Sequence, residues 1–264
     1  MYTYPSGEII LGLLRGIIDG IIGFFDSDVS GDEAWARMDP FNPGTAGNNS
    51  AKIWGGLFAS DTDQPGWGWQ IVSRFTRELP QTLIGFTGSH AANLFGEVES
   101  VEYYDGATVI TGGHNNLLWG LGGPAMTLGS YVIGNNETKA DPYNPIFQHE
   151  YGHVLQSRDA GFKYLGQYAL PSLFSKNNFE HFHYDHPVEQ DANARAFYYF
   201  NEKDDSYSGW HFFENPINGY NRNMPYDDPT NLSVLKGHIL SPAKWYIPGI
   251  FTLYYIFHYR NIQP

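Results

Sequence analysis

With 264 residues, 42% hydrophobic and 17% aromatic, the chain can bury a large core as one domain or two small ones. This excludes a disordered or collagen-like chain despite 30 glycines and 16 prolines. Lys and Arg number 15 against 28 Asp and Glu, and the net charge of -13 argues against nucleic acid as a partner. Because cysteine is absent, any metal has to be held by His, Asp or Glu.

Residues 9–25 form an apolar run with the length of a membrane-spanning helix. Arg15 and Asp19 lie near its middle, at the i,i+4 spacing of a helical ion pair, and two central charges are rare in a spanning segment. A signal peptide would carry its charge ahead of the apolar stretch, so none is indicated. We therefore interpret residues 1–30 as a Gly-rich apolar N-terminal segment that forms a packing or interfacial helix. A membrane-contacting element and a linker remnant are the alternatives.

Residues 31–264 are predicted to form a single α+β domain. Residues 31–65, rich in Gly, Asn, Asp and Pro, indicate loop with short helical pieces. Helical periodicity follows over Trp69–Leu79. Pro80 either ends this helix or begins a second one that continues to about Phe95.

The periodicity then changes from helical to alternating. Val98–Tyr104 and Ala107–Ile110 flank an Asp-Gly pair at 105–106, which predicts a β-hairpin. After a Gly-rich loop at 112–123, Met126–Ile133 indicates another strand. We therefore expect a small, mostly antiparallel sheet.

The second half of the domain is predicted to be mainly helical. Asn144 as a cap and Pro145 at the first helical position predict a helix that runs to about Arg158. Further elements are expected downstream: helices over 162–173, broken around Pro171, and over 187–202, and a last helix or strand over 250–259.

The helix that begins at Asn144 carries an H-E-x-x-H motif, residues 149–153. Residues i and i+4 lie on one face of an α-helix about 6 Å apart, so His149 and His153 can bind one tetrahedral Zn²⁺. Glu150 projects beside the metal and is predicted to act as a general base toward zinc-bound water. The alternative is a helix with two histidines and no metal. Gly152 indicates either close helix packing or a need for space at the metal.

A third protein ligand is expected, with the fourth position open for water. Glu189 on the 187–202 helix is the main candidate, because Asn193 lies one turn further along the same stripe and can fix the tautomer of a ligand histidine. Alanines at 192, 194 and 196 would let this helix pack closely on the motif helix. Glu189 as a first-turn acid near the helix dipole is the alternative, and Asp191 is the competing ligand.

Three histidines and a tyrosine precede this helix: His181, His183, Tyr184 and His186. One of the histidines could be the third ligand. We expect instead that they line the site, where His183, His186 or Tyr184 could stabilise the oxyanion of a tetrahedral intermediate. A solvated loop without a role is the alternative.

The H-E-x-x-H helix followed by E-x-x-A-N, Glu189 to Asn193, resembles the gluzincin zinc metallopeptidases. Residues 35 to about 205 more narrowly resemble the metallopeptidase-like domains at the C-termini of RHS-repeat proteins of Bacteroidetes. The matching stretches are AWARMDPFNP at 34–43, ELPQT at 78–82, FQHEYGHVLQS at 147–157 and HPVEQDAN at 186–193.

The resemblance implies a zincin-like domain in which the sheet packs on the motif helix and on a second helix that bears the glutamate ligand. It implies zinc held by His149, His153 and Glu189, with Glu150 as the base. The substrate would be a peptide or protein, paired with the strand at 126–133. The resemblance also implies an effector, toxin or self-processing module of a larger secreted or cell-surface protein.

Asn193 departs from the commonest gluzincin pattern, in which Asp often follows the glutamate by four residues. An Asn can still accept a hydrogen bond from an imidazole, but it raises the basicity of the ligand less. A non-catalytic alternative stays open. It is a metal-stabilised module that binds protein or carbohydrate through its many aromatic side chains.

Overall fold

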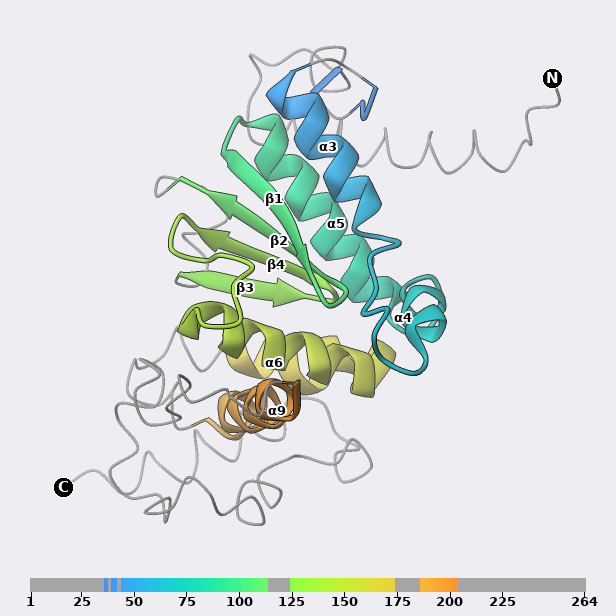
Figure 1. Cartoon of the computed structure of the whole chain (residues 1–264), viewed down its shortest axis with the longest axis vertical. Coiled ribbons are helices and arrows are strands. Elements are labelled where there is room, and N and C mark those ends of the chain that lie inside the picture. The colour runs from blue at the N-terminus through green and yellow to red at the C-terminus, as the bar shows by residue number, and fades with distance from the viewer. Residues whose placement is uncertain (1–35, 38, 42–43, 114–123, 174–185, 204–264) are drawn as a thin grey trace, which may run out of the picture.

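The computed structural model has an α+β architecture in which helices cover both faces of a four-stranded sheet (Figure 1). It describes residues 36–37, 39–41, 44–113, 124–173 and 186–203. The apolar run at 9–25, the side chains of His181, His183 and Tyr184, and the element expected at 250–259 lie outside these ranges. Among the helices of the described ranges, none combines the length and the hydropathy needed to span a bilayer.

The sheet is mixed, with the strand order β1-β2-β4-β3. β1 (Val98–Tyr104) and β2 (Ala107–Gly112) form the expected antiparallel hairpin. Both residues of its turn have positive φ, 46° at Asp105 and 82° at Gly106, as a type I′ turn requires. β4 (Tyr131–Asn135) pairs parallel to β2 and antiparallel to β3 (Ala125–Leu128), which is the edge strand beside the motif helix.

The single strand expected over Met126–Ile133 is wrong, because the chain reverses between β3 and β4. Leu128 pairs with Tyr131 across a two-residue turn. The first residue of this turn, Gly129, has a φ of 68°, a conformation that glycine adopts without strain. Because the alternating pattern continues on both sides of the turn, the turn cannot be recognised from the pattern alone.

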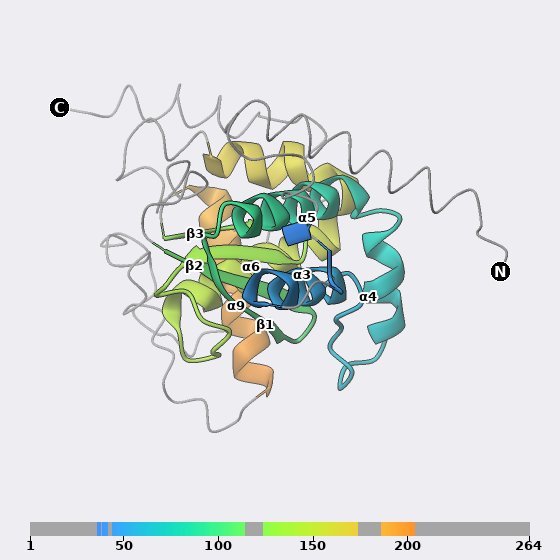
Figure 2. The same cartoon turned by 90° about the horizontal axis from the view of Figure 1, so that it is seen from above.

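Two helices cover one face of the sheet, α3 (Thr45–Gly55) and α5 (Leu79–Leu94) (Figures 1 and 2). α4 (Trp67–Arg74) ends before Pro80, which lies in the first turn of α5 and so begins the second helix. α3 is a full helix, not the short pieces expected there. Its buried Asn49 donates a hydrogen bond to the Val98 carbonyl over 3.0 Å, so tertiary contacts outweigh the low helix propensity of this segment.

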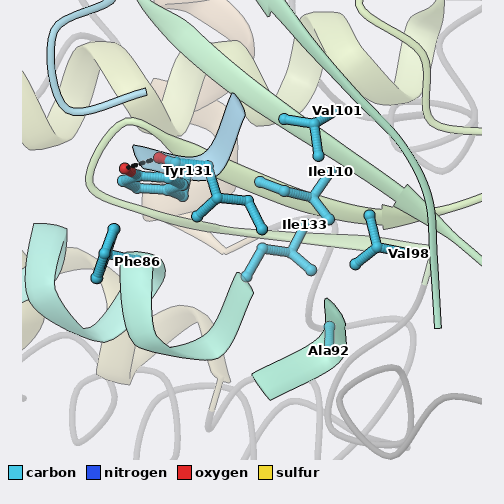
Figure 3. Packing of buried hydrophobic residues seen from close by; sticks show 8 residues of the cluster. Phe86, Ala92, Val98, Val101, Ile110, Tyr131 and Ile133 are labelled. Carbon is cyan, nitrogen blue, oxygen red and sulfur yellow. Dashed lines mark hydrogen bonds between the residues drawn. The ribbon is translucent and has the colours of Figure 1, made fainter. Parts of the chain in front are cut away.

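A cluster of buried apolar side chains lies between these helices and the sheet (Figure 3). Its buried members come from α3, α5 and the strands β1, β2 and β4: Ile53, Phe86, Ala92, Val98, Val101, Ile110, Tyr131 and Ile133. The Tyr131 hydroxyl donates to the Ile53 carbonyl over 2.9 Å, which satisfies the one side-chain polar group of this cluster. The cluster fastens α3 and α5 to the sheet.

The opposite face packs on α6 (Pro145–Ala160), and α6 in turn packs on α9 (Pro187–Lys203). Val109 and Val132 point to this side, whereas the next residue of each strand points to the α3–α5 side. Because successive side chains of a strand alternate between faces, the central strands β2 and β4 are buried on both. α6 and α9 lie close to their predicted bounds.

After α6 the chain forms a connecting segment, Gly161–Leu173, that stays helical to its end. A 3₁₀ turn over Gly161–Lys163 leads into a π-helical stretch over Leu165–Ala169. The break expected around Pro171 is wrong. The wider π turn, in which Leu170 N–H bonds to Leu165 O, directly precedes the proline that has no N–H to donate.

Candidate metal centre

The start of α6 is determined by local sequence. The Asn144 side chain accepts a hydrogen bond from Phe147 N over 3.0 Å, and Pro145 occupies the first turn, where its missing N–H costs nothing. At the other end, Gly161 has a φ of 59° and ends the helix. The H-E-x-x-H motif therefore lies inside a helix whose two ends are both defined by local sequence.

His149, His153 and Glu189 converge although 36 residues separate the second histidine from the glutamate. The two Nε2 atoms lie 3.2 Å apart, and each lies 3.1 Å from the same carboxylate oxygen, Oε2 of Glu189. All three side chains are buried. The donor atoms form a nearly equilateral triangle.

This triangle fits a tetrahedral metal ion. Nitrogen and carboxylate ligands at about 2.0–2.1 Å from such an ion lie about 3.3 Å from one another. The observed separations of 3.1 and 3.2 Å are close to that value. The three residues can therefore hold a metal ion, and Glu189 is more than a first-turn acid of α9.

The outer nitrogen of each histidine contacts a side-chain amide. Asn193 Oδ1 lies 2.9 Å from His149 Nδ1, which is the contact expected from the α9 stripe. Gln156 Oε1 lies 2.8 Å from His153 Nδ1. Gln156 is not among the site residues predicted from the sequence, although it stands one turn beyond His153 on the same helix face.

The orientation of Gln156 determines the tautomer of His153. Its Nε2 donates to Val188 O over 2.8 Å and to Asp191 Oδ2 over 2.6 Å. The amide oxygen is therefore the atom that faces His153, and it can only accept from an Nδ1–H. The Nε2 lone pair of His153 is left to face Glu189. Asp191, the competing ligand, instead holds Gln156 and pairs with Arg195 Nε over 2.8 Å.

Three electron-pair donors that face one another need a cation between them. In the metal-free protein this cation is a proton. Burial opposes the charge on His153, but the carboxylate of Glu189 attracts and hydrogen-bonds the imidazolium and raises the pKa of His153 to about 9. The same arrangement that favours a proton favours a divalent metal ion.

Glu150 lies beside the triangle and is held by the edge strand. Its Oε2 accepts a hydrogen bond from the Thr127 hydroxyl over 2.6 Å, and the same hydroxyl lies 3.1 Å from the Glu150 carbonyl oxygen. Thr127 belongs to β3, so this contact fastens the strand to α6 at the level of the motif. Thr127 is not among the site residues predicted from the sequence, because its position depends on the turn at Gly129.

The triangle opens onto a cleft of about 380 Å³. His149, Glu150, His153 and Glu189 all line it. One wall is formed by β3 and the other by the connecting segment, where the buried Tyr164 donates its hydroxyl to Thr127 O over 3.0 Å. A small molecule or a peptide segment can therefore approach the three donor atoms and Glu150 from one side.

His186 does not have the role expected for it. It is buried, its Nδ1 accepts a hydrogen bond from Val188 N over 3.2 Å, and its carbonyl accepts from Glu189 N over 2.9 Å. It does not line the cleft. His186 thus forms the N-terminal cap of α9 and positions Glu189 through the backbone, while His183 and Tyr184 lie outside the described ranges.

Gly152 provides for close packing of the two helices. A Cβ at this position would lie 2.0 Å from the carbonyl oxygen of Ala192 on α9. Ala192, Ala194 and Ala196 are all fully buried, as expected of small residues that let two helices approach. Close approach at Gly152 brings Glu189 within reach of the histidines.

Comparisons with protein-family models, with curated proteins and with solved structures gave no significant match.

Proposed function

We propose that this protein is a zinc-dependent metallopeptidase with a gluzincin-like site in a zincin-like domain. His149, His153 and Glu189 would hold the zinc ion, and Glu150 would be the general base. The observation that carries this proposal is the buried triangle of donor atoms, with a second carboxylate, that of Glu150, beside it and a cleft that reaches both. When bound, the zinc ion would polarise a scissile carbonyl and make a water molecule more acidic.

The donor set supports zinc over the common hard cations. Calcium and magnesium prefer ligand shells of oxygen, whereas two imidazoles and one carboxylate suit zinc. The same set also suits Fe(II) in oxygenases. Glu150 favours hydrolysis, because a buried carboxylate next to the metal ligands serves a reaction that moves a proton from water to a leaving amine.

The protein residues have separate tasks in this mechanism. Glu150, held by the Thr127 hydroxyl, accepts a proton from the attacking water and returns it to the leaving amine. Asn193 and Gln156 hold the two imidazoles with Nε2 toward the metal position. These hydrogen bonds fix the orientation of the site before the substrate arrives.

The edge strand β3 offers main-chain groups to a peptide. Asn135 N donates to Pro124 O over 2.8 Å, so residues 124, 126 and 128 pair with β4 in the alternating antiparallel pattern. The main-chain groups of Ala125 and Thr127 then face away from β4. An extended substrate can add to this edge as a further strand, although Tyr164 already occupies the Thr127 carbonyl.

The non-catalytic alternative is a metal-stabilised module that binds protein or carbohydrate. Structural zinc sites have four protein ligands. Within the described ranges this group has three, and the cleft reaches them, which favours catalysis. The effector or self-processing role implied by the resemblance depends on the same chemistry.

The proposal is tested by metal analysis and three matched Glu→Gln variants. We expect the purified protein to bind about one zinc ion and to cleave peptides. Glu150→Gln should keep the zinc and lose cleavage, and Glu189→Gln should lose the zinc. Glu99→Gln, an exposed position on β1, should change neither.

A Glu150→Gln variant that cleaves as well as the wild type would refute the mechanism. Iron in place of zinc, with no peptide cleavage, would favour an oxygenase. Growth of cells that express wild type or Glu150→Gln, and mass spectrometry of the purified chain, would test toxicity and self-processing.

A further inference from the structure

The walls of the cleft beside the metal centre are mostly apolar. Their larger apolar side chains are those of Ile84 on α5, Met126 and Leu128 on β3, and Leu165, Leu170 and Leu173 on the connecting segment. Ile84 and Leu170 are 47% and 48% exposed, so a large part of each side chain faces solvent. Exposed apolar surface next to a metal site is typical of a place where a ligand buries its own apolar surface.

Three uncharged polar side chains of the described residues line the cleft, those of Thr127, Tyr164 and Ser172, and the first two are hydrogen-bonded within the protein. The Thr127 hydroxyl bonds to Glu150, and the Tyr164 hydroxyl bonds to the Thr127 carbonyl. Burial raises the pKa of Tyr164 well above its usual value, and the nearby charges of Glu150 and Glu189 raise it further, so this phenol stays neutral. Among the described residues that line the cleft there is no Lys or Arg.

The base of the cleft offers no net positive charge to an acidic side chain. The carboxylates of Glu150 and Glu189 offset the charge of a bound divalent ion, and an Asp or Glu of a substrate would leave water without gaining a cationic partner from the described residues of the walls. An aliphatic or aromatic side chain has no such cost, because it would contact the leucines, Met126 and Ile84.

We propose that this cleft binds one apolar side chain of the peptide substrate, next to the scissile bond. Cleavage would occur beside residues such as Leu, Met or Phe, and peptides with Asp or Glu at that position would be poor substrates. This inference rests on the proposed peptidase function and adds its substrate class. The mouth residues Ile84 and Leu170 are specificity-determining residues in this account.

The experiment uses the zinc-loaded full chain and a mixed peptide library whose cleavage products are sequenced by mass spectrometry. We expect Leu, Met and Phe to be enriched at one position beside the cleaved bond. Individual peptides that differ only at this position should show kcat/KM at least about tenfold higher for Leu than for Asp, the effect of one apolar contact.

Two lysine variants of the connecting segment test whether the substrate side chain binds in this cleft. Leu170→Lys should lower kcat/KM for the Leu peptide about tenfold and should improve cleavage of the Asp peptide relative to the Leu peptide. Phe162→Lys is the matched control, because Phe162 is 67% exposed on the same segment but does not line the cleft. Both variants should retain the zinc content of the wild type.

Different results would overturn the peptidase function and the apolar substrate class. Cleavage that requires Glu150 but shows no apolar enrichment would overturn the substrate class and leave the peptidase function intact. A response to Leu170→Lys no larger than that to Phe162→Lys would also overturn it. A zinc-loaded chain that cleaves no peptide would overturn the proposed function and this inference together.

Discussion

The packing of α3 and α5 on the sheet and the packing of α6 on α9 differ in their chemistry. The α3–α5 face is closed by an apolar cluster of aliphatic and aromatic side chains (Figure 3). Behind the other face, the contact between α6 and α9 buries His149, His153, Gln156, Glu189, Asp191 and Asn193. Burial of so many polar groups is costly unless they are paired. The apolar cluster thus contributes stability, whereas the polar side chains between α6 and α9 surround a position that can hold a cation.

Two buried histidines show the difference directly. His90 on α5 lies against the rings of Phe86 and Trp54, and within the described ranges neither of its ring nitrogens has a hydrogen-bond partner. Burial lowers its pKa to about 3. His153 is also buried, but its two nitrogens face Gln156 and Glu189, and its pKa is raised to about 9. Burial alone keeps a histidine neutral, whereas a buried carboxylate partner favours a cation at its ring nitrogen.

The largest change in stability and zinc binding should come from a methyl group added between α6 and α9. Gly152→Ala would place its Cβ 2.0 Å from a backbone carbonyl of α9, which cannot move without shifting the helix. We expect a loss of about 3 kcal/mol in the free energy of unfolding, together with weaker zinc binding, because Glu189 moves with α9. Chemical denaturation and zinc titration would measure both.

Gly88→Ala on the opposite face is the control. Its Cβ would lie 3.6 Å from Ile133 Cδ1, an ordinary van der Waals contact, and alanine is the better helix former. This variant should be about 1 kcal/mol more stable than the wild type, with unchanged zinc affinity. Equal effects of the two alanines would mean that the helices of the metal centre do not pack more closely than those of the apolar face.

Features that depend on neighbouring residues could be predicted from the sequence. The spacing of His149 and His153, the cap at Asn144 and the shared stripe of Glu189 and Asn193 follow from helix geometry alone. The hairpin over β1 and β2 follows from its Asp-Gly turn.

Features that depend on packing could not be predicted from the sequence. The helicity of α3 and the contact of Thr127 with Glu150 arise from residues that are distant in sequence. The turn at Gly129 and Ser130 lies between two alternating runs that look like one strand. His186 is adjacent to a predicted site helix, yet it caps that helix and does not line the cleft.

A smaller effect is expected from His90 at acid pH. Because its pKa is about 3 in the folded state and near 6.5 in the unfolded state, the unfolded chain binds the extra proton between these values. Stability is therefore lost as the pH falls below about 6.5, by about 2 kcal/mol between pH 7 and pH 5. His90→Leu, of similar volume, should lack this part of the loss.

Denaturant titrations of the wild type and His90→Leu at pH 7 and pH 5, both with excess chelator, isolate the contribution of His90 to the pH dependence of the free energy of unfolding. The remaining groups titrate alike in both and cancel in the difference. An identical pH dependence of wild type and variant would show that His90 can accept a proton in the folded state. The contrast with His153 would then be lost.

The smallest effect concerns the amide that orients His149. Asn193→Leu removes the acceptor 2.9 Å from His149 Nδ1 and should weaken zinc binding about tenfold, as loss of such a partner does elsewhere. Asn193→Asp keeps an acceptor at the same place and, because a carboxylate raises imidazole basicity more, should bind zinc at least as tightly as the wild type. Competition with a chelator of known affinity ranks the three proteins. If the Leu variant binds as tightly as the Asp variant, the side chain at 193 only fills space, and this part of the α6–α9 contact resembles the apolar packing on the other face.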